Sequence, residues 1–255
     1  MNPIQGASPR TVEILGVRVH DVTYREALDI MESFIGDGEP RLVVTVNPEL
    51  LMTAQSDQSF KEVLNQAALS LPDGMGLLWG SRFLGRPLRQ RVAGVDTVQM
   101  LAALSARKGY RLFLLGAAPG VAKEAAKRLS ARCPGLVVAG TYAGSPREDE
   151  EAEILARIGA ARPDFLLVAY GAPRQEKWIH RNLESLRVPV AMAVGGSFDF
   201  ISGRARRAPL WMQRAGLEWL HRLCREPWRW KRMLALPRFA GAVFIEGISS
   251  RFGRR

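Results

Sequence analysis

One acidic residue lies where a reacting group could meet a substrate. Asp73 follows a short apolar run, stands between Pro72 and Gly74, and precedes an apolar segment that begins near Met75. An Asp at the start of a helix often caps it by accepting hydrogen bonds from free backbone amides. An Asp at the mouth of a cleft can instead accept a proton from a substrate as a general base. The sequence position is compatible with both roles.

Four arginines near the C-terminus have a spacing that would gather their charges. Arg222, Arg225, Arg229 and Arg232 follow one another at intervals of three, four and three residues. On a continuous helix they would share one face. Such a face could neutralise the phosphates of a nucleoside diphosphate, or it could be an ordinary solvated surface. The spacing favours neither interpretation.

Other kinds of catalytic site have little support. The chain has only three histidines and two cysteines, and it lacks GxSxG, GxGxxG, GxxxxGK[ST] and Asp-x-Asp patterns. The acidic run from Glu148 to Glu151 is typical of the first turn of a helix rather than of a metal site. We therefore expect no bound metal, no cofactor and no disulfide framework.

Charge and tryptophan are concentrated in the last fifth of the chain. Residues 204–255 carry 13 Arg and Lys against three acids, a net of +10 out of +11 for the whole chain. Four of the six tryptophans lie there, at positions 211, 219, 228 and 230. We place a boundary between a core of residues 1–203 and an appendage of residues 204–255. This composition predicts an anionic, partly apolar partner and leaves a phospholipid surface, a polyphosphate group and a nucleic acid open.

Signals for export or membrane insertion are not visible in the sequence. The first ten residues contain no long apolar region behind basic residues, which a secretory signal requires. No apolar run reaches the ~20 residues that a bilayer-spanning helix needs. We expect a cytoplasmic protein that is either soluble or peripheral on a membrane.

Alternating strands and helices must position the candidate residues. Apolar runs predict strands at Leu42–Val46, Leu69–Leu71, Arg111–Leu115, Leu136–Ala139, Asp164–Tyr170 and Val190–Val194. Between them lie helical patterns, with helix starts expected at Thr23, Asp96 and Pro119. In the appendage we expect two helices, Leu210–Glu226 and a second from Pro227. The alternation predicts an α/β fold: a Rossmann-like, mostly parallel sheet flanked by helices, with a small C-terminal helical appendage.

In such sheets, ligands bind at the carboxyl ends of the strands. The residues at or just after the ends of the predicted strands include Thr45, Asn47, Asp73, Gly116, Gln175 and Gly195. Glycines at these positions would let a phosphate approach the backbone. Turn formation alone also favours Gly and Pro there, and for any single loop this is the simpler explanation.

One of these loops points to a different class of enzyme. The segment from Leu115 to Gly120 resembles the cofactor loop of S-adenosylmethionine-dependent RNA methyltransferases, whose RNA the basic appendage would bind. In those enzymes an Asp comes just before the loop, whereas Phe113 and Leu114 precede it here. Their loop also usually follows the first strand rather than a later one. We keep this methyltransferase as the alternative, with a non-catalytic lipid- or nucleic-acid-binding module as the third hypothesis.

Several spaced blocks together resemble one family of glycosyltransferases. They are Thr45–Glu49, Pro72–Gly74, Arg91–Asp96, Gly171–Trp178, Gly195–Asp199, Arg207–Met212 and Gly216–Leu220. In this order, over nearly the whole chain, they are similar to the WecG/TagA/CpsF family (glycosyltransferase family 26). So many blocks in one order are far more specific than any single loop.

The resemblance implies an inverting, metal-independent transferase. It would move a sugar from a UDP-sugar of the N-acetylmannosamine, mannosaminuronate or glucose type to a polyprenyl-diphosphate-linked saccharide. The product would be a cell-surface polysaccharide or a teichoic-acid-type polymer. The family pattern does not fix which sugar, which acceptor saccharide or which polymer is involved.

The resemblance also implies roles for individual residues. Asp73 would be the base for the acceptor hydroxyl. The other substrate-binding residues would be Thr45, Asn47, Arg91, Gly116, Gln175, Gly195, Arg222, Arg229 and Arg232, with the last three folded over the UDP diphosphate. The appendage would dock on the anionic inner face of the cell membrane, and no nucleic acid would be bound. The sequence leaves homo-oligomer formation open.

Overall fold

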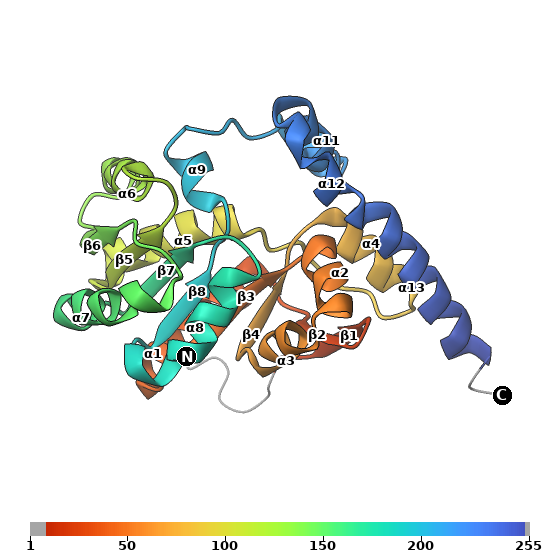
Figure 1. Ribbon diagram of the computed structural model, residues 1–255, viewed down its shortest axis with the longest axis horizontal. Coiled ribbons are helices and arrows are strands. Elements are labelled where there is room, and N and C mark those ends of the chain that lie inside the picture. The colour runs from red at the N-terminus through yellow and green to blue at the C-terminus, as the bar shows by residue number, and fades with distance from the viewer. Residues whose placement is uncertain (1–8, 253–255) are drawn as a thin grey trace.

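A six-stranded parallel sheet forms the centre of the chain, of which the computed structural model describes residues 9–252 (Figure 1). The strands lie in the order β4-β3-β8-β7-β5-β6, and every neighbouring pair is parallel. They are β3 (Arg41–Val46), β4 (Leu69–Pro72), β5 (Arg111–Gly116), β6 (Val137–Tyr142), β7 (Phe165–Ala169) and β8 (Val190–Ala193). All six predicted strands and the α/β fold class are confirmed. Residues 1–8, on which the expectation of no secretory signal largely rests, lie outside the described residues.

Helices cover both faces of the sheet, because alternate strand residues belong to two separate cores. Leu42 and Val44 of β3 face a core shared with α2, α3, α7 and α8, whereas Val43 faces a core shared with α1, α5, α6 and α9. Burial on both faces explains why these strands are nearly continuous apolar runs. The helices are α1 (Tyr24–Asp37), α2 (Pro48–Ser56), α3 (Gln58–Gln66), α4 (Met75–Phe83), α5 (Gly94–Lys108), α6 (Val121–Arg132), η1 (Glu148–Glu150), α7 (Glu151–Ala161), α8 (Arg174–Leu186) and α9 (Ser197–Ile201).

The predicted helix starts have mixed outcomes. The capping box at Thr23 is confirmed, because the Thr23 side chain accepts from the Glu26 amide and the Glu26 carboxylate accepts from the Thr23 amide at 2.7 Å. The predicted cap at Asp96 is wrong: α5 begins at Gly94, and the Asp96 carboxylate in its first turn pairs with Arg207 instead. Helix α6 begins at Val121, two residues after Pro119.

A short antiparallel hairpin, β1 (Thr11–Ile14) and β2 (Val17–His20), was not predicted. Its two turn residues, Leu15 and Gly16, both have positive φ angles, 52° and 73°. Positive φ at both positions is typical of the tight turns that join antiparallel strands, but only the second turn residue is a glycine. Four-residue strands around an atypical turn carry little signal in the sequence.

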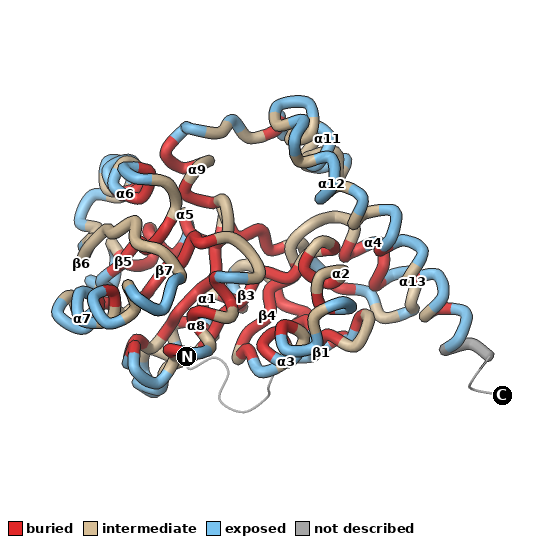
Figure 2. The backbone as a smooth tube through the Cα atoms, in the orientation of Figure 1, coloured by how far each residue is buried: buried red, intermediate tan, exposed pale blue. Residues whose placement is uncertain are grey.

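The appendage is more broken than the two predicted helices. It contains α10 (Leu210–Arg214), α11 (Glu218–Arg225), η2 (Pro227–Arg229), α12 (Trp230–Met233) and α13 (Ala235–Phe252). Gly216, with a φ of 72°, interrupts the first predicted helix, and α11 ends at Arg225, one residue before the predicted helix end at Glu226. Helices α10 to α12 are largely exposed or half-buried, in contrast to the buried sheet (Figure 2).

The last helix, α13, is more firmly attached than the rest of the appendage. It packs against α2 and α4, and its Phe239 and Val243 are buried in the core. The boundary at residue 203 remains a prediction, since α13 shares a core with residues far before it. Within residues 9–252, no helix has both the length and the apolar character needed to cross a bilayer.

Candidate active site

A cleft of about 440 Å³ lies at the carboxyl ends of the central strands and is partly covered by the appendage. It brings together all of the predicted site residues except Gly116: Thr45, Asn47, Asp73, Arg91, Gln175, Gly195, Arg222, Arg229 and Arg232. Gly116 is absent from the lining residues of this cleft. A Cβ atom at Gly116 would come within 2.8 Å of the Ala169 carbonyl carbon, so close packing against β7 explains this glycine.

Asp73 faces the cleft and does not cap a helix. The N-cap position of α4 is Gly74, and no side chain caps that helix. The Asp73 carboxylate instead lies 3.4 Å from Arg91 Nε and 3.5 Å from the Gly94 amide, and its side chain is 26% exposed. Burial raises the pKa of Asp73, and the charge of Glu218 raises it further, while the nearby Arg91 guanidinium acts in the opposite direction. A weakly bonded carboxylate of raised pKa is suited to accept a proton.

Thr45 and Asn47 reach the cleft from the end of β3. The Asn47 side chain caps α2 by accepting from the Leu50 amide at 3.0 Å, which fixes it at the rim. Thr45 is buried, and its methyl group lies 3.3 Å from where a Cβ atom of Gly94 would be. The glycine at the start of α5 therefore lets that helix approach β3 closely.

Gln175 joins two loops of the cleft. Its buried amide oxygen accepts from the Gly171 and Gly195 amides, both at 3.1 Å, and its nitrogen donates to Glu176 at 2.8 Å. The loops after β7 and β8 are thereby held together. Glu176 was not predicted to be a site residue, although it also lines the cleft. Burial raises the pKa of its carboxyl to about 7.

Three of the four spaced arginines converge on the cleft. Arg222, Arg229 and Arg232 come from α11, η2 and α12, whereas the exposed Arg225 is absent from the lining. Burial lowers the pKa of Arg229, and the positive charges of Arg222 and Arg232 lower it further. Cations that repel one another in a half-buried cleft form a site for an anion.

The same arginines have partial partners within the chain. Glu226 pairs with both Arg222 and Arg229, and Arg232 pairs with Glu49. The Arg222 guanidinium also lies over the Phe200 ring, 5.1 Å from its centroid. Because α11 ends at Arg225, Arg229 and Arg232 reach the cleft from η2 and α12 and do not share a continuous helical face with Arg222.

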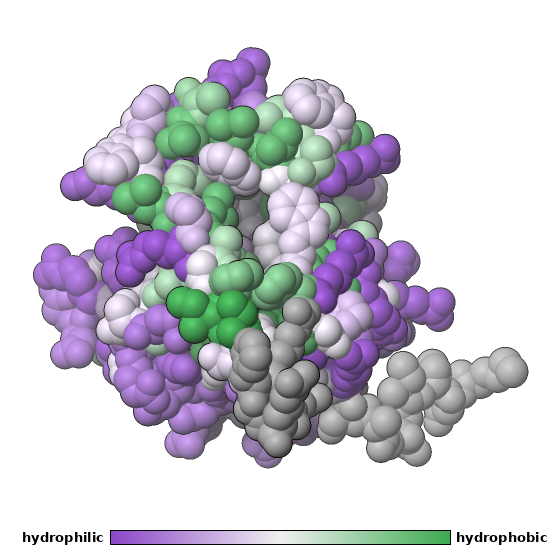
Figure 3. Space-filling model, turned by 90° about the vertical axis from the view of Figure 1, so that its right-hand side faces the viewer, coloured by the Kyte–Doolittle hydropathy of each residue, from purple (hydrophilic) through white to green (hydrophobic). Residues whose placement is uncertain are grey.

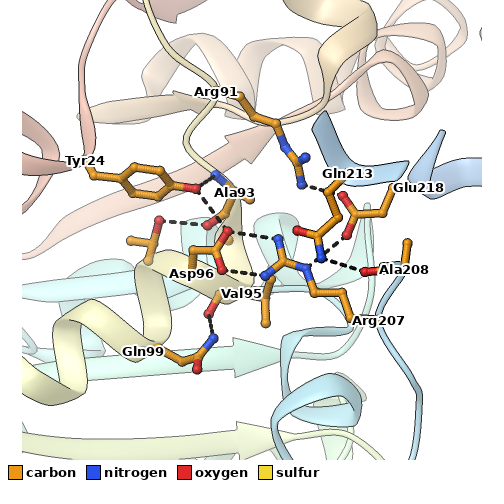
Figure 4. Close-up of polar contacts among 12 residues, drawn as sticks. Tyr24, Arg91, Ala93, Val95, Asp96, Gln99, Arg207, Ala208, Gln213 and Glu218 are labelled. Atoms are coloured by element: carbon orange, nitrogen blue, oxygen red, sulfur yellow. Dashed lines mark hydrogen bonds and ion pairs between the residues drawn. The ribbon is translucent and has the colours of Figure 1, made fainter. Parts of the chain in front are cut away.

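An ionic network that includes Arg91 ties the appendage to the core (Figure 4). Arg91 donates to Glu218 at 2.5 Å, and Glu218 accepts from Arg207 at 3.0 Å. Arg207 in turn pairs with Asp96 through both terminal nitrogens, and Asp96 accepts from the Tyr24 hydroxyl at 3.1 Å. Among these residues, only Arg91 was predicted to belong to the site. Arg207, Glu218 and Asp96 stand in the sequence blocks described above, but the pairs that join them to the core, Arg91 with Glu218 and Arg207 with Asp96, cross more than 100 residues and leave no local signal.

Comparisons with known proteins give a consistent result. Residues 12–253 match a family model described as "Glycosyl transferase WecG/TagA/CpsF family". Three similar relatives are named N-acetylglucosaminyldiphosphoundecaprenol N-acetyl-beta-D-mannosaminyltransferase. The Bacillus subtilis (strain 168) protein is 37% identical, with 89% of this chain and 91% of the relative covered. The Bacillus spizizenii protein is 36% identical, with 83% of this chain and 81% of the relative covered. The Staphylococcus aureus (strain MW2) protein is 30% identical, with 89% of this chain and 90% of the relative covered. These matches give the methyltransferase alternative no support.

Proposed function

Because the chain belongs to the WecG/TagA/CpsF family of glycosyltransferases, we propose that it transfers N-acetylmannosamine from a UDP-sugar to a polyprenyl-diphosphate-linked N-acetylglucosamine. The names of the relatives supply both the sugar and the acceptor. Their products carry a β-linked sugar, whereas UDP-sugars are α-linked, so a single displacement with inversion accounts for the reaction. The product would enter the synthesis of a cell-surface polymer.

The observation that carries this proposal is that one cleft is lined both by Asp73 and by three arginines, Arg222, Arg229 and Arg232. In the proposed reaction, the Asp73 carboxylate takes the proton of the acceptor hydroxyl as its oxygen attacks the anomeric carbon. The bond from that carbon to the diphosphate oxygen breaks, and the electron pair leaves with UDP. Arg222, Arg229 and Arg232 stabilise the negative charge that develops on the diphosphate.

The remaining predicted residues shape the cleft in this proposal. Gln175 fixes the Gly171 and Gly195 loops, and Asn47 and Thr45 form the wall at the end of β3. Gly116 has no support as a substrate-binding residue, because it is not part of the cleft lining.

A transfer assay tests the proposed function directly. Radiolabelled UDP-sugars are offered together with a short-chain lipid-linked N-acetylglucosamine, and the product is separated by chromatography. We expect transfer from UDP-N-acetylmannosamine, and thermal stabilisation of the protein by UDP but not by S-adenosylmethionine. Transfer from another UDP-sugar alone would correct the donor, and stabilisation by S-adenosylmethionine alone would overturn the assignment.

Chelation is expected to leave the transfer rate nearly unchanged. Arginines take the place of a metal in the proposed charge neutralisation, and within the described residues no three His, Cys, Asp or Glu side chains gather into a possible metal site. The assay is run with and without EDTA. A loss of activity that Mg²⁺ or Mn²⁺ restores would contradict the proposed role of the arginines.

Membrane docking by the appendage is also part of the proposal. Large apolar side chains are exposed along it, including Trp228 at 73% and Ile245 at 66%. On the face that carries the C-terminal helices, apolar residues gather at the top and centre with hydrophilic groups at the edges (Figure 3). Tryptophan at the interface and arginine near anionic lipid are typical of a peripheral membrane protein.

The double variant Trp228→Ser with Ile245→Ser is expected to bind anionic vesicles about tenfold or more weakly, because two exposed apolar side chains no longer enter the interface. Sedimentation with vesicles measures the binding, which should also weaken as salt is added. The control is Met100→Ser, which removes an exposed apolar side chain from α5. Equal loss in the control variant, or no loss in the double variant, would exclude the appendage as the docking surface.

A further inference from the structure

Glu218, one of the few acids in the basic appendage, lies between two arginines. Its Oε2 accepts from Arg91 Nη2 at 2.5 Å, and its Oε1 accepts from Arg207 Nε at 3.0 Å. Arg91 reaches Asp73 only through Nε, at 3.4 Å, which is long for a hydrogen bond. The strong bond of Arg91 therefore goes to Glu218, and the weak one goes to Asp73.

The weak bond between Arg91 and Asp73 affects the proton affinity of Asp73. An arginine that bound Asp73 closely would stabilise the carboxylate and make it a poor base. Glu218 opposes this in two ways: it occupies a terminal nitrogen of Arg91, and its own negative charge disfavours a second charge on Asp73. Burial and the Glu218 charge both raise the pKa of Asp73, against the lowering effect of Arg91.

We propose that Glu218 is a positioning residue for sugar transfer, holding Arg91 so that Asp73 remains basic enough to deprotonate the acceptor. The inference rests on the proposed role of Asp73 as the base. Glu218 belongs to the appendage, and Asp73 and Arg91 belong to the core. Asp73 is therefore kept basic only when the appendage is packed against the core. The ion pair between Arg207 and Asp96 holds the appendage in that position.

Other ionisable groups lie near Asp73, Arg91 and Glu218, and they determine which measurement can test the proposal. Next to Arg91 and Glu218 lie Arg207, Asp96 and Tyr24. The cleft is also lined by Glu49, Glu176, Asp199, Arg206, His221, Arg222, Arg229 and Arg232. Because the pKa of Glu176 is raised to about 7, the pH profile of the rate would mix two carboxyl groups. The protonation of Asp73 must therefore be observed directly.

The experiment titrates the Asp73 carboxyl carbon by ¹³C NMR in full-length protein labelled at aspartate. The Asp73 signal is identified by its loss in Asp73→Asn. In Glu218→Gln, which keeps the size of the side chain but removes the charge, we expect the midpoint to fall by about one pH unit. The transfer rate on a soluble acceptor should fall ~3-fold or more, because a weaker base accepts the proton less readily. Glu218→Asp should lie closer to the wild type, since it keeps the charge.

The matched control is Glu246→Gln, which removes another appendage acid that bonds to the core, at the Leu15 amide 2.9 Å away. It should leave both the midpoint and the rate unchanged. An unchanged Asp73 midpoint in Glu218→Gln would overturn the inference and reduce Glu218 to a structural contact, whatever happens to the rate. A lowered midpoint with an unchanged rate would instead refute Asp73 as the base, and the two failures are thus distinguishable.

Discussion

Asp73→Asn should transfer sugar ~10²–10⁴-fold more slowly than the wild type, because an amide cannot take the proton of the acceptor hydroxyl. The loss should appear in kcat, while UDP binding stays close to normal, since the arginines that face the diphosphate are untouched. Folding should also be preserved. Asp73 does not cap α4. Burial raises the pKa of Asp73, so its anionic form does not stabilise the fold at a pH above the pKa of the unfolded state.

The measurement combines transfer on a soluble acceptor, UDP affinity and the unfolding temperature. Asp29→Asn serves as the control, because Asp29 is a half-exposed acid on α1 whose ion pair with Arg25 is loose, at 3.9 Å. It should be as active as the wild type. If Asp73→Asn turned over within a few-fold of the wild type, the base would have to be another residue of the cleft.

The second large effect is expected from the arginines of the appendage. Arg222→Ala and Arg229→Ala should each lower kcat ~10²-fold or more, because the leaving diphosphate loses a charged donor in a partly dehydrated site. Arg232→Ala should cost less, since Arg232 is 46% exposed, against 28% for Arg222 and 22% for Arg229. Side-chain exposure thus predicts different effects for three arginines that the sequence spacing does not distinguish.

Arg225→Ala is the matched control for these variants. Arg225 is on the same helix as Arg222 and carries the same charge, but it is exposed and does not line the cleft. A water-soluble, short-chain acceptor removes any contribution from membrane recruitment. Full activity of all three cleft variants on that acceptor would leave the appendage as an anchor only. Truncation after Gly203 is a poorer test, because it would also remove Phe239 and Val243 from the core.

The sheet and most of the cleft could be predicted because their signals are local. Strands buried on both faces are apolar runs, and the rule that ligands bind at carboxyl ends of strands selects Thr45, Asp73 and Gln175 without any knowledge of contacts. The same rule also selected Gly116, because a glycine required by packing against Ala169 is indistinguishable in sequence from one required by a ligand.

The appendage could not be predicted to the same depth. The net charge of the appendage predicted a basic surface. A net charge does not show that one acid, Glu218, bonds to Arg91, which is 127 positions away in the chain. Helical spacing placed Arg225 with the other arginines, whereas Arg225 is exposed and does not line the cleft. Long-range ion pairs and single-residue breaks depend on tertiary context, which a spacing pattern does not contain.

The packing of α13 has a practical consequence for engineering. This helix packs against α2 and α4. Helix α2 begins directly after Asn47, and α4 begins two residues after Asp73. Gly80 of α4 leaves no spare room, since a Cβ atom there would lie 3.0 Å from the Phe239 ring. An appendage transplanted from a relative would therefore meet a surface shaped for a different side chain. Chimaeras that aim to change the membrane preference should exchange α2, α4 and α13 as one unit.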